Sequence, residues 1–322
     1  MPDRARAVVC PGPLKGVLSA EAAARALGGG LVRAGLEADE APMADGGEGT
    51  AAAFRAGLGG EWLSASVSDP FGRPVEARLA LLPDGRAVVE AAEAVGLSRL
   101  GSGELDPVRA SSRGLGELIL AALAAGASGL VVGLGDSATV DGGAGLRDVL
   151  DDLRVTTVVA CDVANPLLGP RGAARAFGPQ KGASPEQVEE LERRLTADSE
   201  LAPFADVPGA GAAGGLGAAL AFLGATLVPG AKLVAGAIGL RERLDGASFV
   251  VTGEGTVDVA SREGKVTGLV AKLAAEAGVR CVVFGGRVEA ELPQADTVGL
   301  SGDPSRAEAD LDELGERLGK KL

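Results

Sequence analysis

The sequence contains no histidine and no tyrosine, and only one tryptophan among its 322 residues. Without histidine, Ser-His-Asp hydrolases, His-ligated zinc sites and histidine general bases are excluded. Proton transfer must therefore use Asp, Glu or Lys. Aromatic residues make up 2% of the chain, so it has few side chains on which bases could stack. This argues against binding of single-stranded nucleic acid.

Positive charge is also scarce, since 31 Lys and Arg residues face 44 Asp and Glu residues, for a net charge of -13. A surface of this sign repels a phosphate backbone, so we expect no nucleic-acid partner. The three cysteines lie far apart beside Val-rich runs: Cys10, Cys161 and Cys281. We interpret them as small core residues of a protein in a reducing compartment.

No membrane segment is expected. Asp3 and Arg4 lead directly into a strand, without a signal-peptide pattern. The long uncharged run at residues 207–231 is rich in Gly and poor in bulky apolar side chains, which does not suit a spanning helix. We therefore predict a cytoplasmic protein with no membrane partner.

The two ends of the chain alternate between strand and helix patterns. The expected strands are residues 7–10, 40–43, 249–251, 281–284 and 297–300. Ser19 is a plausible N-cap of the first helix, and Gly35 ends it. Alternation of this kind predicts a parallel sheet covered by helices, and five such strands suit a flavodoxin-like sheet.

The middle of the chain follows a different pattern. Residues 63–68, 75–82 and 87–90 read as consecutive strands separated by turn signals, which predicts an antiparallel meander. A helix capped by Ser111 or Ser112 follows. We predict an α/β fold in which a flavodoxin-like parallel-sheet domain is interrupted by a second, inserted α/β domain with a mixed sheet. The predicted boundaries are residues 1–59 with 246–322 for the first domain and 60–245 for the insert.

Three acidic, glycine-rich loops each follow an expected strand: residues 45–50, 135–145 and 252–258. Glycine lets the backbone approach a ligand closely, and free N–H groups at a helix start attract phosphate. Carboxylates repel phosphate unless a divalent cation lies between them, so the loops predict Mg²⁺. Any one loop could be an ordinary tight turn, but three at the carboxyl ends of strands favour a ligand site.

Three lysines lie in or beside glycine loops: Lys15, Lys181 and Lys265. Such a lysine can neutralise charge on a phosphoryl group in transfer, although a solvated surface lysine is the usual alternative. A G-x-G-x-x-G match at residues 209–214 has no good strand before it and no acid about 20 residues on, so we interpret it as close backbone packing. Lys265 is followed by Val266 and Lys320 by Lys321, so no Walker A motif is present.

Motifs recur in one order along nearly the whole chain: Leu14-Lys-Gly16 and residues 42–50, 69–75, 110–112, 137–145, 161–169, 178–183, 209–217, 252–258 and 264–265. In the order and the residues of these motifs, the chain resembles the type I glycerate kinases. The resemblance implies phosphorylation of D-glycerate, dependent on ATP and Mg²⁺, to 2- or 3-phosphoglycerate. It also implies a two-domain α/β fold and a small-molecule partner, with a homodimer left open.

The resemblance implies the following site residues: catalytic groups Lys15, Asp45, Asp141 and Asp162; substrate-binding groups Arg73, Ser112, Asn165 and Lys181; nucleotide-binding groups Gly46, Gly47, Glu48, Ser137, Thr139, Gly142, Gly143, Gly253, Glu254, Gly255 and Lys265; and metal ligands Asp45 and Asp258. Asp141 or Asp45 is the base or the metal anchor. Arg73 or Ser112 holds the substrate carboxylate.

The chain departs from the family pattern at several points. The usual Pro-Asp-Ser-Phe-Lys-Gly is Pro-Gly-Pro-Leu-Lys-Gly at residues 11–16, and the usual Gly-Gly-Ser is Gly-Asp-Ser at residues 135–137. Ala260-Ser261 replaces Gln-Thr, and the stretch between residues 150 and 155 is shortened. A lost carboxylate near a reacting centre costs orders of magnitude in rate. A divergent relative with another substrate or a binding role is therefore the alternative, and an NAD-dependent oxidoreductase is a third reading.

Overall fold

The computed structural model describes residues 5–259, 261 and 265–321, which form two compact units. Unit 1 comprises the described residues up to 45, residues 52–58 and those from 231 on; unit 2 comprises residues 46–51 and 59–230. This division differs from the predicted boundaries at 59/60 and 245/246, because residues 231–245 pack within unit 1 and residues 46–51 within unit 2. The predicted boundaries stay a prediction. Ala260, named above as a departure from the family pattern, lies outside the described residues.

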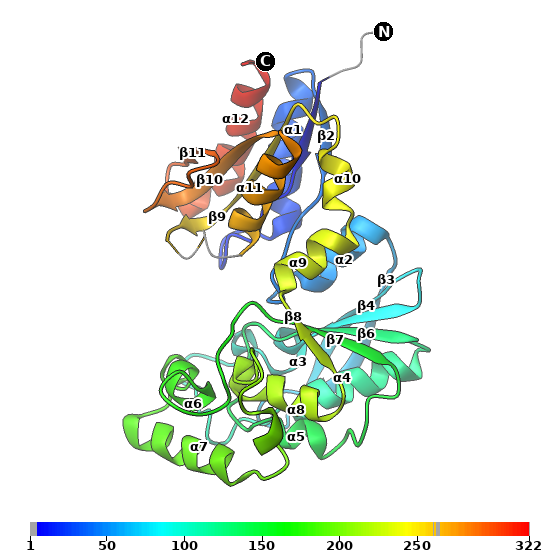
Figure 1. The fold of residues 1–322 in the computed structure, drawn as a ribbon, viewed down its shortest axis with the longest axis vertical. Coiled ribbons are helices and arrows are strands. Elements are labelled where there is room, and N and C mark those ends of the chain that lie inside the picture. The colour runs from blue at the N-terminus through cyan, green and yellow to red at the C-terminus, as the bar shows by residue number, and fades with distance from the viewer. Residues whose placement is uncertain (1–4, 260, 262–264, 322) are drawn as a thin grey trace. The chain divides into compact units, whose positions relative to one another are not determined.

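Unit 1 is built on a five-stranded sheet with the order β11-β10-β9-β1-β2 (Figure 1). Its strands are β1 (Arg6–Val9), β2 (Glu37–Glu40), β9 (Phe249–Val257), β10 (Arg280–Val288) and β11 (Asp296–Gly299). Every pairing is parallel. In chain order the strands run 2-1-3-4-5, which is the flavodoxin-like order. The predicted fold class is confirmed, although β2 begins and ends three residues before the expected segment.

Helices cover both faces of this sheet. The helices that lie wholly or mainly in unit 1 are α1 (Ala20–Arg33), α2 (Thr50–Leu58), α9 (Gly230–Ala237), α10 (Leu240–Leu244), α11 (Val266–Ala277) and α12 (Ala307–Gly319), with a 3₁₀ turn η6 (Pro304–Arg306). Alternate strand residues such as Ala7 and Val9 pack against α1 and α12 in one core cluster. Val8, between them, is also fully buried, as expected for strands covered on both faces. Ser19 caps α1 as predicted.

Unit 2 is built on a mixed six-stranded sheet with the order β3-β4-β5-β6-β7-β8. Its strands are β3 (Glu61–Ser68), β4 (Pro74–Leu81), β5 (Arg86–Glu90), β6 (Gly129–Gly133), β7 (Thr156–Ala160) and β8 (Thr226–Val228). The first three pair antiparallel and the last four parallel. The predicted meander and mixed sheet are therefore confirmed.

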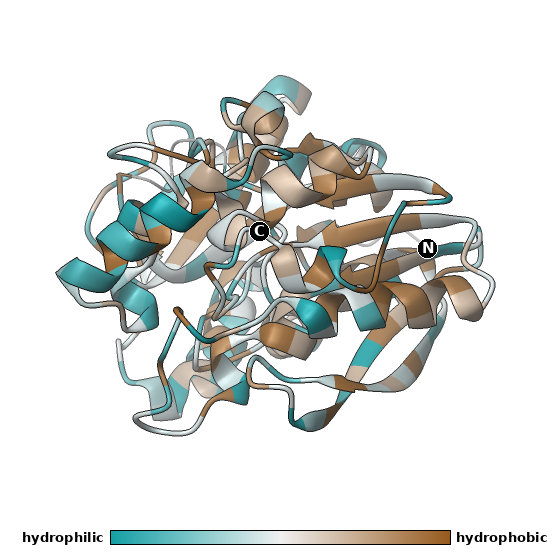
Figure 2. Ribbon diagram, turned by 90° about the horizontal axis from the view of Figure 1, so that it is seen from below, coloured by the Kyte–Doolittle hydropathy of each residue, from teal (hydrophilic) through white to brown (hydrophobic). Residues whose placement is uncertain are grey.

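The helices of unit 2 are α3 (Ala91–Val95), α4 (Arg113–Ala124), α5 (Ala144–Arg147), α6 (Ala173–Phe177), α7 (Pro185–Ala197) and α8 (Leu216–Phe222), with 3₁₀ turns η1 (Leu97–Arg99), η2 (Pro179–Lys181), η3 (Ala202–Phe204) and η4 (Ala212–Gly214). Hydrophobic residues concentrate in the strands and on the helix faces that cover them (Figure 2). Leu115, Leu118 and Ile119 of α4 are fully buried. The capping box at Ser184 and Gln187 is present at the start of α7.

The G-x-G-x-x-G match serves close packing, as predicted. A Cβ atom at Gly211 would lie 2.2 Å from the carbonyl oxygen of Pro166, and one at Gly214 would lie 2.0 Å from that of Thr139. No disulfide joins the three cysteines, all of which are among the described residues, and Cys161 alone is not fully buried, so it is not the core residue expected. Within the described residues, no helix combines the length and apolar character needed to cross a membrane.

Candidate active site

In unit 1, the Lys15 loop after β1 meets the glycine-rich segment of β9. The predicted loop at residues 252–258 is wrong up to Val257, because these residues continue β9 and pair with β10. The amide of Gly12 donates to the carbonyl oxygen of Gly253 at 2.9 Å, and a Cβ atom at Gly255 would lie 3.9 Å from the backbone nitrogen of Lys15. From β1 the chain proceeds to β2 on one side of the sheet, and from β9 to β10 on the other. Open α/β sheets bind ligands in the crevice at such a reversal.

Positive groups surround this crevice. The side chains of Lys15 and Lys265 are exposed, and Lys265 is the N-cap residue of α11. Glu254 accepts a hydrogen bond from Thr267 Oγ1 at 2.7 Å, which fixes its carboxylate beside the first turn of α11. Free N–H groups and the positive end of a helix dipole favour phosphate binding at such a terminus.

The two predicted metal ligands also lie in unit 1. The amide of Met43 donates to the carbonyl oxygen of Pro11 at 2.9 Å, so the segment that leads to Asp45 runs beside the Lys15 loop. Asp258 Oδ1 accepts bonds from the amide (3.0 Å) and hydroxyl (3.3 Å) of Ser261. No group of three or more Asp, Glu, Cys or His in the described ranges could hold a metal alone. Mg²⁺ carried by a nucleotide needs only one or two protein carboxylates, so Asp45 and Asp258 fit that use.

In unit 2, the loop of residues 46–51 packs against the ends of β6 and β7. The amide of Gly135 donates to the carbonyl oxygen of Gly46 at 3.0 Å. A Cβ atom at Gly46 would lie 2.3 Å from the carbonyl oxygen of Ala160, and one at Gly135 would lie 2.3 Å from the Cα of Gly47. Glycine is therefore required here by close backbone contact, while the side chain of Glu48 is exposed.

Glu90, the last residue of β5, holds the same loop, and the sequence analysis missed it. Its carboxylate accepts bonds from the amides of Ala51 (2.6 Å) and Gly49 (3.2 Å), and the residue is 5% exposed. Burial raises the pKa of Glu90 to about 7, although the two amide bonds oppose the shift. The one signal available was a glutamate that ends a Val-Val strand.

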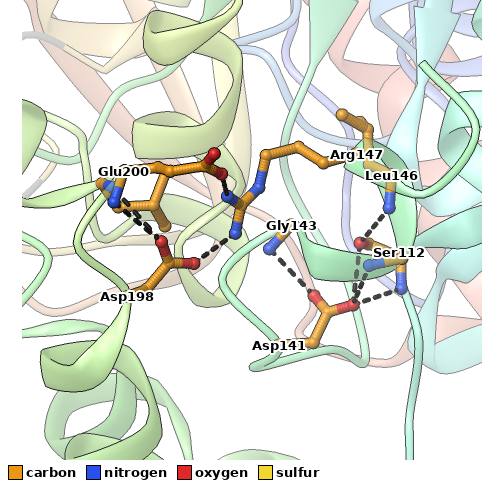
Figure 3. Close-up of polar contacts among 9 residues, drawn as sticks. Ser112, Asp141, Gly143, Leu146, Arg147, Asp198 and Glu200 are labelled. Atoms are coloured by element: carbon orange, nitrogen blue, oxygen red, sulfur yellow. Dashed lines mark hydrogen bonds and ion pairs between the residues drawn. The ribbon is translucent and has the colours of Figure 1, made fainter. Parts of the chain in front are cut away.

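Ser112 and Asp141 form a compact network (Figure 3). Asp141 Oδ2 accepts bonds from the amide and hydroxyl of Ser112, both at 2.8 Å, and from the amide of Gly145, while Oδ1 accepts one from Gly143. Ser112 Oγ accepts a bond from the amide of Leu146 at 3.0 Å. Ser112 occupies the N-cap position of α4 but makes no capping bond, because its hydroxyl is committed to Asp141 and Leu146. Ser111, the other residue of the expected cap, accepts a bond from the amide of Arg113, the first residue of α4, at 3.3 Å.

Lys181 is brought together with Ser137 and Thr139, but in the interior. Lys181 is 3% exposed, and its Nζ donates to Ser137 Oγ at 2.9 Å and to the carbonyl oxygen of Thr139 at 2.8 Å. Burial lowers the pKa of Lys181 to about 7, opposed by Asp141 and Asp136. Within the described residues, Thr139 Oγ1 is buried without a hydrogen-bond partner. Gly142 is buried beside this region.

Asp136 replaces the usual glycine of the family pattern in a backbone conformation that favours glycine. Its φ is +59°. The carbonyl oxygen of Asp136 accepts a bond from Leu97 at 2.9 Å, and its carboxylate accepts a long bond of 3.5 Å from the amide of Glu48. The left-handed conformation is costly for L-residues and least so for Asp and Asn. Through its bond to the Glu48 amide, the carboxylate of Asp136 lies against the acidic loop at residues 46–51.

The remaining predicted residues lie in separate turns of unit 2. Asp162 Oδ1 accepts a bond from the amide of Gly230 at 2.6 Å, and Asn165 Nδ2 donates to the carbonyl oxygen of Arg171 at 2.7 Å. Arg73 is exposed, and its guanidinium pairs with Glu104 (2.8 Å) and Asp69 (2.5 Å). These carboxylates, Glu104 first, raise the pKa of Arg73.

A cavity of about 920 Å³ lies along α11 in unit 1, between α9, α10 and residues 292–294. No predicted site residue lines it. The predicted residues lie instead mostly in loops, with Gly253, Glu254 and Gly255 inside β9 and Lys181 in η2.

Comparison with known proteins identifies the family. The model of the glycerate kinase family matches residues 7–151 and 148–308. The two matches meet at residues 148–151, beside the stretch that is shorter than the usual pattern.

Individual relatives match over most of their length. The glycerate 2-kinase of Escherichia coli K12 is 40% identical over 309 residues, which cover 83% of this chain and 81% of that protein. The glycerate kinase of Bacillus subtilis 168 is 36% identical and covers 87% of this chain and 85% of its own. A crystal structure from Salmonella typhimurium LT2, assigned as glycerate kinase 2, superposes with a TM-score of 0.85 at 32% identity, over 99% of this chain and 98% of the other. The chain therefore belongs to the glycerate kinase family.

Proposed function

We propose that this glycerate-phosphorylating enzyme transfers the γ-phosphoryl group of ATP, with Mg²⁺, to the 2-hydroxyl of D-glycerate. The observation that carries the proposal is the meeting of the Gly12–Lys15 segment with Gly253 at the carboxyl ends of β1 and β9. The name of the E. coli relative, a glycerate 2-kinase, supports the choice of hydroxyl. No disulfide joins the three described cysteines, which is typical of a reducing compartment, and we propose a cytoplasmic location.

The nucleotide phosphates are assigned to unit 1. Lys15 and Lys265 neutralise phosphate charge, and the amides at Gly253, Gly255 and the start of α11 donate to phosphate oxygens. Asp258 would hold Mg²⁺, which would supply positive charge to offset the charge that develops in transfer.

The roles of the candidate residues follow from where the fold holds them. Asp141 accepts four hydrogen bonds, which gives it a structural role. The segment that leads to Asp45 runs beside the Lys15 loop, so we assign the proton-accepting role to Asp45. The Ser112 hydroxyl is buried and committed within the fold. The guanidinium of Arg73 is exposed and pairs with Glu104, whose side chain is partly exposed as well. We therefore assign the glycerate carboxylate to Arg73, where it would replace Glu104.

The test is a coupled assay with ATP, Mg²⁺ and a panel of D-glycerate, L-glycerate, glycolate and lactate, with ³¹P NMR to identify the product. We expect 2-phosphoglycerate from D-glycerate. Lys15→Ala and Asp45→Asn should lower kcat by about 100-fold or more, as expected when charge stabilisation or the proton acceptor is lost. Lys320→Ala, which alters an exposed lysine after α12, is the matched control.

A second candidate is a divergent relative that binds a hydroxy-acid without phosphorylating it. The observation that favours it is Gly12, where the family pattern carries a carboxylate. Ligand binding by calorimetry without ADP release from any member of the panel would establish this reading and overturn the first.

A further inference from the structure

A carboxylate distant in sequence holds the acidic loop of residues 46–51. Glu90 Oε1 accepts the amide of Ala51 at 2.6 Å, and Oε2 accepts that of Gly49 at 3.2 Å. We propose that Glu90 is a positioning residue for phosphoryl transfer, which fixes the backbone of this loop so that its glycines and Glu48 meet the ligand in one geometry. The proposal rests on the proposed kinase function and on the nucleotide-binding role that the family resemblance implies for Gly46, Gly47 and Glu48.

The loop needs such a clamp because its own residues do little to order it. Gly46 and Gly49 have φ values of +95° and +92°, and glycine loses more conformational freedom on ordering than any other residue. Helix α2 has no acidic residue in its first turn. Thr50 Oγ1 donates to the carbonyl oxygen of Gly47 at 2.7 Å, and this bond satisfies no amide of the helix start. Glu90 supplies the acceptor that the helix start lacks.

Burial indicates that Glu90 serves more than stability. It is 5% exposed, and no Lys or Arg side chain forms an ion pair with it within the described residues. A buried carboxylate without a cationic partner is costly. Glu93 and Glu48 add to that cost by raising its pKa. An amide side chain would be cheaper to bury, but it has one acceptor oxygen, whereas the loop presents two N–H groups.

The experiment compares Glu90→Ala and Glu90→Gln with a matched control, Asp310→Asn. Asp310 is also a buried carboxylate that accepts a backbone amide, that of Ser301 at 3.0 Å, but it lies in α12 outside every candidate site residue. The measurements are kcat, the KM values for ATP and D-glycerate, and Tm, on the full chain.

We expect Glu90→Ala to lower kcat at least about tenfold with both KM values within about threefold, since misplacement of about 1 Å costs more in rate than in binding. Glu90→Gln should fall between Glu90→Ala and the unaltered chain, because it keeps one acceptor. Asp310→Asn should lower Tm and leave kcat unchanged. If Glu90→Ala does not fold, the kcat of Glu90→Gln relative to the unaltered chain tests the positioning role instead.

The two ideas fail in different ways. A kcat for the Glu90 variants equal to that of Asp310→Asn at matched Tm would overturn the positioning role. If Asp45→Asn and a Glu48→Gln variant also keep full kcat, the loop takes no part in transfer and the proposed function of the loop falls instead.

Discussion

Ser112 donates two hydrogen bonds to a single oxygen of Asp141, one from its amide and one from its hydroxyl, each at 2.8 Å. Together they join the start of α4 to the loop that follows β6. Ser112 and Asp141 were both expected from the sequence to contact ligand. In the structure they bond to each other and hold the loop after β6 in place, so we expect both to contribute to stability.

Ser112→Ala should therefore destabilise the fold by about 1–3 kcal/mol, because it leaves the Leu146 amide and one Asp141 lone pair unpaired. Urea unfolding monitored by circular dichroism measures the change. Ser111→Ala is the control, since Ser111 Oγ accepts one long bond, from Arg113 at 3.3 Å, and a few tenths of a kcal/mol are expected. Equal losses for the two variants would contradict the network.

The buried Lys181 predicts a rise in stability with pH. Its pKa is lowered to about 7 in the folded state, so between pH 7 and about 10.5 the unfolded chain binds a proton that the folded chain does not. Lys181 should therefore make the free energy of unfolding increase as pH rises across that window. As pH falls to 7, the same residue should make it decrease.

Urea unfolding at several pH values between 7 and 10 should show this slope in the native chain and a smaller one in Lys181→Met. The chain has no tyrosine, but the pKa values of Cys10 and Cys281 are raised by burial. As pH rises through about 9 these thiols ionise first in the unfolded chain, which lowers the free energy of unfolding and opposes the Lys181 slope. The difference between the native chain and Lys181→Met, which share both thiols, isolates the Lys181 contribution. Identical slopes would show that Lys181 stays charged.

Glycine should stabilise the protein at two positions whose backbone is in the left-handed conformation, Ala213 and Asp136. Ala213 has φ +52° and ψ +36°, so Ala213→Gly should stabilise the protein by about 0.5–1 kcal/mol once the added freedom of the unfolded chain is deducted. Asp136→Gly should gain less, because Asp tolerates this conformation. Differential scanning calorimetry measures both. Gly215→Ala is the opposite control and should destabilise, since its Cβ would lie 2.8 Å from the Cα of Gly142.

Restoring the carboxylate that the family pattern carries at residue 12 should be sterically tolerated. A Cβ atom on Gly12 would lie 3.6 Å from Gly253 O and from Val266, which is ordinary contact. We expect Gly12→Asp to fold with Tm within about 3 °C and to lower the Mg²⁺ concentration for half-maximal rate. Gly12→Asn, which matches the shape without the charge, should leave that concentration unchanged. A shift of equal size in both variants would rule out a role for the charge.

The sheet architecture was predictable because its signals are local. Valine-rich segments such as Ala7–Cys10 end in glycine-rich turns, and the alternation with helices implies parallel pairing. The end of β2 was misplaced because residues 41–43 continue to bond β1 and its extension as extended chain, with Ala41 donating to Val9. Such a tail has the pattern of a strand without forming a ladder.

The candidate site was predictable where it lies in loops and unpredictable where it depends on distant pairing. Glu90 bonds Gly49 across 41 positions, and Lys181 bonds Ser137 across 44. No local pattern marks either partner. Sequence placed Lys181 in a glycine loop, which suggested exposure, but packing of η2 buries its ammonium against the carbonyl oxygen of Thr139.

The parallel pairing of Ala7 in β1 with Phe249 in β9 has a consequence for biosynthesis. At about 5–20 residues per second, a ribosome exposes β1 roughly 10 to 50 seconds before the strand that completes its pairing. During that interval one edge of an apolar strand has no neighbour, and such edges invite association with other chains. All six strands of unit 2 emerge in the meantime, so unit 2 can fold on the ribosome while unit 1 must close after it.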